Sequence, residues 1–91
     1  MRNNLREQIL IDLKTIKNKG KGFKELDSKY FKAFYDKDKC YYFFYQLLFL
    51  QNIKDDILKV FFNTTDTGLF MFREEIIDII EDYLLNEELA S

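Results

Sequence analysis

The chain of 91 residues contains no histidine and a single cysteine, Cys40. A zinc site needs several nitrogen or sulfur ligands, so none can form within one chain. No histidine is present to activate Cys40 as a nucleophile, and we expect a buried structural thiol rather than a catalytic one. A lone cysteine also excludes an internal disulfide, which favours a reducing compartment such as the cytoplasm.

Motifs of other common sites are missing as well. Paired carboxylates such as Asp55-Asp56 and Glu74-Glu75 lack the spacing of a calcium loop, and we expect them at solvated helix ends. The stretch KGKG at 19–22 is basic and flexible, but it lacks the preceding strand and the following hydroxyl residue of a phosphate-binding loop. We therefore expect no metal, no cofactor and no enzymatic activity.

No hydrophobic run is long enough to suggest a membrane span. The longest, residues 40–50, is broken only by Gln46 and falls short of the about 20 residues that a bilayer requires. The N-terminus lacks the apolar core and cleavage site of a signal peptide. Proline and tryptophan are also absent, and the bias toward residues with AT-rich codons favours a phage, plasmid or AT-rich bacterium as the source.

Hydrophobic residues make up 47% of the chain, which excludes a disordered segment and fits one small folded domain, 1–91. The charge is unevenly placed. Residues 1–39 carry a net +5 and residues 40–91 a net −7. Two interpretations stay open: the halves attract each other inside the fold, or the surface is dipolar with two interaction faces.

Three helices are expected in the first half of the chain. Asn4 is placed to cap the first, whose apolar stripe ends near Asn18, Gly20 and Gly22. A short second helix follows a cap at Asp27 or Ser28. After the polar turn 36–39, the third helix covers about 39–51.

The segment 56–73 favours a β-hairpin. Two runs rich in β-favouring side chains, 56–62 and 69–73, flank the turn-forming sequence NTTDTG. The competing interpretation is a helix from Ile53 to Phe62 capped by Asn52. A final helix then begins with Glu74 and Glu75 in its first turn. The expected fold is α+β, with an all-α bundle of four to five helices as the alternative.

This order of elements resembles the winged helix-turn-helix superfamily over about 70% of the chain. The resemblance rests on the hairpin, on apolar positions of the first and third helices and on the segment that leads into the second: Ile9, Leu10 and Leu13, then Phe44, Leu47 and Leu50, and the sequence GFKEL at 22–26. It implies binding to duplex DNA, with the third helix in the major groove and the hairpin on the backbone or in the minor groove. Candidate contacts to bases and phosphates are Lys24, Lys29, Lys32, Lys37, Lys39 and Gln46. The turn of the expected hairpin carries Asp66 and no basic residue, which speaks against duplex recognition.

The aromatic run 40–50 is apolar nearly all round a helix. It is either the central helix of the core or partly exposed as an interface. Tyr41, Tyr42 and Tyr45 are expected on the outside, because their hydroxyls tolerate water and tyrosine is enriched in binding sites. Stacking of single-stranded bases on these rings is a further interpretation.

The C-terminal stretch 74–88 is acidic, with a net charge of −6 when Arg73 is included. It forms either a solvated helix face or a surface for a basic partner, and five of its carboxylates are candidate contacts: Glu74, Glu75, Asp78, Glu81 and Asp82. We expect a non-catalytic protein-binding module, an inhibitor, immunity factor or accessory subunit of a phage or mobile element. Its partner would be another protein, such as a nucleic-acid enzyme with a basic groove, or a second copy. The alternative is a nucleic-acid-binding regulator or replication accessory protein.

Overall fold

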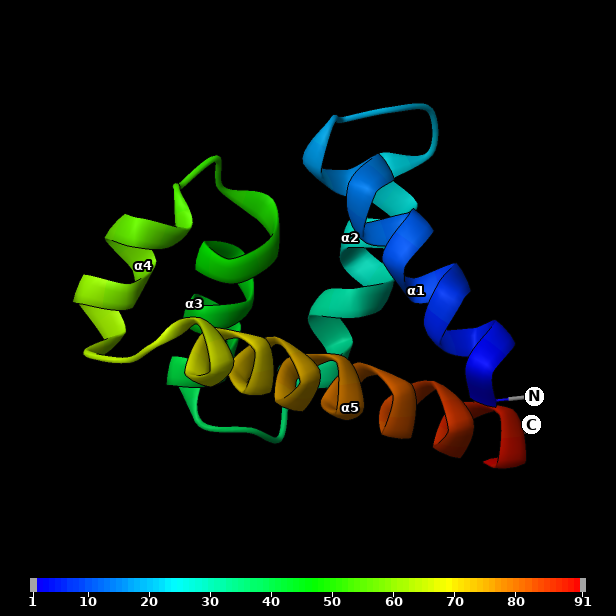
Figure 1. Ribbon diagram of the computed structural model, residues 1–91. Coiled ribbons are helices and arrows are strands. Elements are labelled where there is room, and N and C mark those ends of the chain that lie inside the picture. The colour runs from blue at the N-terminus through cyan, green and yellow to red at the C-terminus, as the bar shows by residue number, and fades with distance from the viewer. Residues whose placement is uncertain (1, 91) are drawn as a thin grey trace.

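A long C-terminal helix, α5 (Asp66–Ala90), contacts most of the other helical elements. The computed structural model describes residues 2–90, with the side chains of 4–87. In Figure 1, α1 (Arg2–Lys17) and α2 (Phe23–Phe31) lie side by side at one end of α5. The longest dimension of the molecule, 41 Å, is close to the length of α5, because 25 helical residues extend about 1.5 Å each.

The other end of α5 carries α3 (Lys39–Tyr45) and α4 (Asp55–Phe62). Residues 2–90 form five α-helices and contain no β-strand. The expected α+β fold with a hairpin at 56–73 is therefore wrong, and the resemblance to winged helices loses its wing. The all-α alternative is the architecture found.

The sequence NTTDTG ends one helix and begins the next. Asn63 adopts the left-handed conformation (φ 52°) that commonly follows a helix. The amides of Asn63 and Thr64 donate to the carbonyls of Val60 and Lys59, which closes α4 with a Schellman motif. Thr65 then caps α5 by accepting a hydrogen bond from the Gly68 amide at 3.2 Å. The turn-forming residues thus end α4 and begin α5. Residues 74 and 75 lie well inside α5 and not in its first turn, where they were expected.

The expected apolar stripe of α1 and its end just before Asn18 are confirmed, but the expected cap at Asn4 is wrong. Ile9, Leu13 and Ile16 are buried, but Asn4 lies inside the helix rather than capping it. At the C-terminus, Lys19 and not a glycine takes the left-handed conformation (φ 53°). The amides of residues 19 and 20 close this end with a second Schellman motif.

The second helix also starts differently from expectation, whereas the third begins at Lys39 as expected. Gly22, with φ 84°, precedes α2, so Asp27 and Ser28 lie within the helix and cap nothing. A 3₁₀ turn, η1 (Lys32–Phe34), extends α2. Asp38 caps α3 by accepting a hydrogen bond from the Cys40 amide at 3.0 Å.

A π-turn, η2 (Gln46–Leu50), continues α3 and places the aromatic segment between α1 and α5. The core is made of thirteen buried apolar side chains from all five helices and both turns: Ile9, Leu13, Ile16, Tyr30, Ala33, Phe34, Tyr45, Leu48, Leu58, Leu69, Ile76, Ile77 and Ile80. Within residues 40–50, Tyr45 and Leu48 are buried, Cys40 and Phe43 are exposed and the rest are half-buried, so the segment belongs to the core and is also partly exposed.

Candidate functional site

In the aromatic segment, the position of a ring around the helix, and not its polarity, decides whether it is buried or exposed. Tyr45 is fully buried and lies with its ring centroid 5.0 Å from that of Phe34, whereas Phe43 is 47% exposed. The expectation that the three tyrosines lie outside is wrong for Tyr45, which offers no surface to a partner. Tyr41 and Tyr42 are half-buried.

Exposed apolar side chains gather instead on α4. Ile57, Val60 and Phe61 are 59%, 81% and 57% exposed, and their spacing puts them on one side of the helix. The opposite side carries Leu58, which is buried, and Phe62, which packs against the core. The helix α4 is therefore apolar on two sides, and only one of them is covered.

Ring contacts connect this outer side to α3 and α5. The ring centroids of Phe43 and Phe61 are 6.2 Å apart, those of Phe61 and Phe62 5.0 Å, and those of Phe62 and Phe72 5.4 Å. We call Phe43, Ile57, Val60, Phe61 and Phe72 the apolar surface. A connected apolar area of this kind is typical of an interaction site.

A cavity of about 410 Å³ opens beside the apolar surface. Its lining combines side chains of α3, η2, α4 and α5: Asp38, Cys40, Tyr41, Phe44, Leu48, Phe62, Phe72, Glu75 and Ile76. Leu48 and Ile76 are buried and form the floor, while Asp38 and Glu75 are exposed at the mouth. The lining residues include two carboxylates and no cation.

Cys40 lies at this mouth and is exposed, which corrects the expectation of a buried thiol. The hydrogen bond from its own backbone amide lowers the pKa of the Asp38 carboxyl. In return, a hydrogen bond to Asp38 and the negative charge of that carboxylate raise the pKa of the Cys40 thiol. A raised pKa leaves less thiolate at neutral pH, so Cys40 is a poorer nucleophile than an ordinary cysteine.

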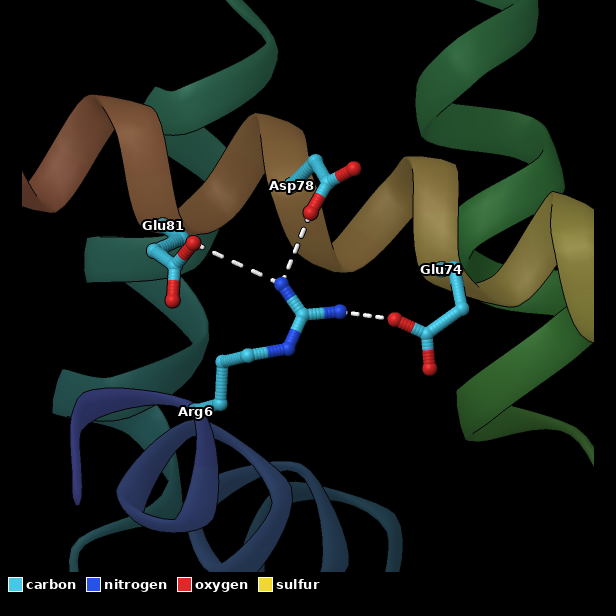
Figure 2. Close-up of polar contacts among 4 residues, drawn as sticks. All are labelled: Arg6, Glu74, Asp78 and Glu81. Carbon is cyan, nitrogen blue, oxygen red and sulfur yellow. Dashed lines mark hydrogen bonds and ion pairs between the residues drawn. The ribbon is translucent and has the colours of Figure 1, made fainter. Parts of the chain in front are cut away.

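The acidic side of α5 is partly neutralised within the chain. Arg6 of α1 reaches across to three carboxylates and forms ion pairs with Glu74, with Asp78 at 2.7 Å and with Glu81 at 3.4 Å (Figure 2). Glu81 is only 2% exposed. The basic and acidic halves of the chain thus attract each other here, and the acidic surface is smaller than the sequence suggests. Asp82 stays exposed.

A buried polar contact joins α1 to α2. The Tyr30 hydroxyl donates a hydrogen bond to the Asp12 carboxylate, which also accepts one from Gln8 at 2.8 Å. Both Tyr30 and Asp12 are buried. Sequence reasoning missed this pair, although Asp12 interrupts the apolar positions of α1 and was the available signal.

The candidate nucleic-acid contacts lie in more than one part of the molecule. Lys24, Lys29 and Lys32 line a shallow groove between α2 and the C-terminal part of α5, together with Glu25 and Glu87. Lys37 and Lys39 are exposed in the turn before α3 and at its start, and Gln46 is half-buried in η2.

Among the described residues, no three histidine, cysteine or acidic side chains come close enough to hold a metal ion. The described helices also include none that is both long and apolar enough to cross a bilayer. No protein-family model matches the chain, and comparison with curated proteins and with solved structures gives no significant match.

Proposed function

We propose that the protein is a non-catalytic protein-binding module of the cytoplasm, an inhibitor, immunity factor or accessory subunit carried by a phage or other mobile element. The observation that carries this proposal is the outer side of α4, where Val60 is 81% exposed and is flanked by Ile57 and Phe61. Isolated apolar residues on a surface are ordinary, but a connected group that includes aromatic rings is typical of an interface.

The non-catalytic part of the proposal draws on the reactive groups of the chain. The sequence has no histidine to act as a general base. Its one thiol, Cys40, has a raised pKa because it lies beside Asp38. A single free, exposed cysteine also suits a reducing compartment such as the cytoplasm.

The charge near the apolar surface favours a basic protein partner, such as the groove of a nucleic-acid enzyme. Glu75 lies next to the cavity and Asp82 is exposed further along α5. Arg6 pairs with Glu74, Asp78 and Glu81 of the same helix, so these three contribute less to such a contact. A second copy of the chain is the remaining protein partner, since its N-terminal half is basic.

Nucleic-acid binding ranks second. The lysines along α2 support it, because exposed cations on one helix can contact phosphates. Glu25 and Glu87 line the same groove and oppose it electrostatically. The two functions therefore predict contacts on different sides of the molecule.

Site-specific photo-crosslinking in cells that carry the gene tests the proposal. A benzophenone amino acid replaces Val60 in one version of the protein and Lys24 in the other. We expect a discrete protein adduct from position 60 and none from position 24. Adducts from position 24 alone, or no protein adduct from position 60, would contradict a protein-binding role for α4.

A further inference from the structure

The cavity beside the apolar surface is built to take an apolar group. Its floor is formed by Leu48 and Ile76, and its walls include the rings of Phe44, Phe62 and Phe72. The volume of about 410 Å³ is that of a pocket rather than a packing defect. An apolar side chain that enters the cavity would be shielded from water on every side except the one at the mouth.

The mouth adds a charge preference. Asp38 and Glu75 are both exposed there, and no cation lines the cavity. Asp38 keeps its charge readily, because the hydrogen bond from the Cys40 amide lowers its pKa. Positively charged groups beside the inserted side chain would therefore be attracted, and negative ones repelled.

The surroundings of the cavity indicate the shape of the occupant. Phe44 and Phe62 in its wall contact Phe43 and Phe61 on the surface, with ring centroids 6.1 Å and 5.0 Å apart. The apolar area thus continues from the cavity over the adjacent side of α4. An amphipathic helix presents several apolar side chains along one face and fits such a groove.

We propose that this cavity receives an apolar anchor side chain from a basic amphipathic helix of a protein partner, with lysine or arginine residues of that helix beside Asp38 and Glu75. The proposal rests on the protein-binding function above and specifies its partner. In this arrangement Phe72 contacts the anchor side chain. Asp38 and Glu75 select a partner helix that is positively charged.

The position of Cys40 provides a direct measurement, because it is the only cysteine of the chain and lies at the mouth. The probe is a synthetic helical peptide with leucine and phenylalanine along one face and lysine on the other. Two controls accompany it: the same peptide with glutamate for lysine, and a scrambled version of the basic peptide. Fluorescence anisotropy gives affinity, and the rate of Cys40 alkylation by iodoacetamide reports occupancy of the cavity.

We expect the basic amphipathic peptide alone to bind and to slow alkylation as it saturates the protein. The variant with Asp38→Asn and Glu75→Gln keeps the cap of α3 and loses the charge, and its affinity should fall about fivefold. The matched control, Glu7→Gln with Glu25→Gln, changes the net charge equally but away from the cavity, and should bind as the wild type does. Phe72→Ala should weaken binding at least about tenfold.

A measurement without substitution guards against loss of folding. Coupling of a benzyl group to Cys40 through a disulfide fills the mouth of the cavity and should abolish peptide binding while the helical circular-dichroism signal persists.

Equal binding of the acidic peptide, or binding that leaves Cys40 unprotected, would overturn the proposal. The photo-crosslinking experiment at position 60 would still test the protein-binding function separately. Protection of Cys40 that grows with protein concentration in the absence of peptide would show that a second copy fills the cavity, and would overturn the proposal as well.

Discussion

The two buried tyrosines of the core should respond to the same substitution with opposite signs. Tyr30 and Tyr45 are 1% and 0% exposed. The Tyr30 hydroxyl donates to the Asp12 carboxylate, but the Tyr45 hydroxyl has no hydrogen-bond partner among the described residues. Tyr30→Phe removes a hydrogen bond to a buried charged group, which costs about 1.5–3 kcal/mol. Tyr45→Phe removes a buried hydroxyl that has no hydrogen-bond partner among the described residues, which should raise the free energy of unfolding by about 1–3 kcal/mol.

Urea denaturation of the wild type and both variants, followed by far-ultraviolet circular dichroism, measures the difference. We expect Tyr30→Phe to lower the free energy of unfolding and Tyr45→Phe to raise it, a gap of roughly 3 kcal/mol. Since small domains have urea m-values of about 1–3 kcal/mol/M, the transition midpoints should differ by about 1 M or more. Equal m-values would confirm that the substitutions act on stability and not on the extent of unfolding.

A loss of stability in Tyr45→Phe similar to that in Tyr30→Phe would refute the reasoning. It would mean that the Tyr45 hydroxyl is hydrogen-bonded in solution, through a buried water or through a carboxylate. Asp27 is the nearest candidate, because its charge contributes to the raised pKa of Tyr45 after burial itself.

Three further outcomes follow from the same geometry. Burial raises the pKa of both Tyr30 and Tyr45, so their contribution to stability is complete below the unfolded value of about 10 and is lost above it. The free energy of unfolding should fall by about 1.4 kcal/mol per pH unit for each tyrosine above pH 10, and less steeply in Tyr30→Phe, as urea titrations at several pH values would show. Arg6→Gln removes three ion pairs, one of them to the buried Glu81, and should destabilise the fold by about 2–4 kcal/mol in the same assay. Lys59→Gln removes ion pairs to the exposed carboxylates of Asp56 and Asp66 and should have little effect. Lys19→Gly should raise the melting temperature, because the left-handed conformation at this position costs lysine up to about 1 kcal/mol that glycine avoids; an unchanged or lower value would show that this helix end is not strained.

The fold could be predicted from the sequence where one helical period is strong. The spacing of Ile9, Leu13 and Ile16 gave α1 correctly, because a single buried face is enough to identify a helix. Residues 56–62 could not be assigned in this way, since a short run that is apolar on both sides has no clear period. The sequence signal that excludes a hairpin lies in the apolar positions of α5. Leu69, Ile76 and Ile80 continue one helical face back toward Thr65, which caps the helix well before the expected start near Glu74.

The sequence did not predict which rings of the aromatic segment lie outside. An exposed aromatic surface was expected on Tyr41, Tyr42 and Tyr45, on the ground that hydroxyls tolerate water. Packing against α5 and η1 fixed the rotation of α3 instead, so Tyr45 turned inward and Phe43 outward. Rotation of a helix that is apolar all round depends on its neighbours, and no pattern within residues 40–50 records it.

The outer side of α4 separates the requirements of the fold from those of the proposed function. A helix of eight residues is not stable by itself, so α4 depends on its packing against α5 and on the Arg73–Asp55 ion pair of 2.9 Å. Leu58 and Phe62 supply the apolar part of that packing. Ile57 and Val60 contribute almost nothing to it, and polar residues there would complete an ordinary amphipathic helix with better solubility. The side chains that the fold does not need are therefore the ones on which the proposed binding rests.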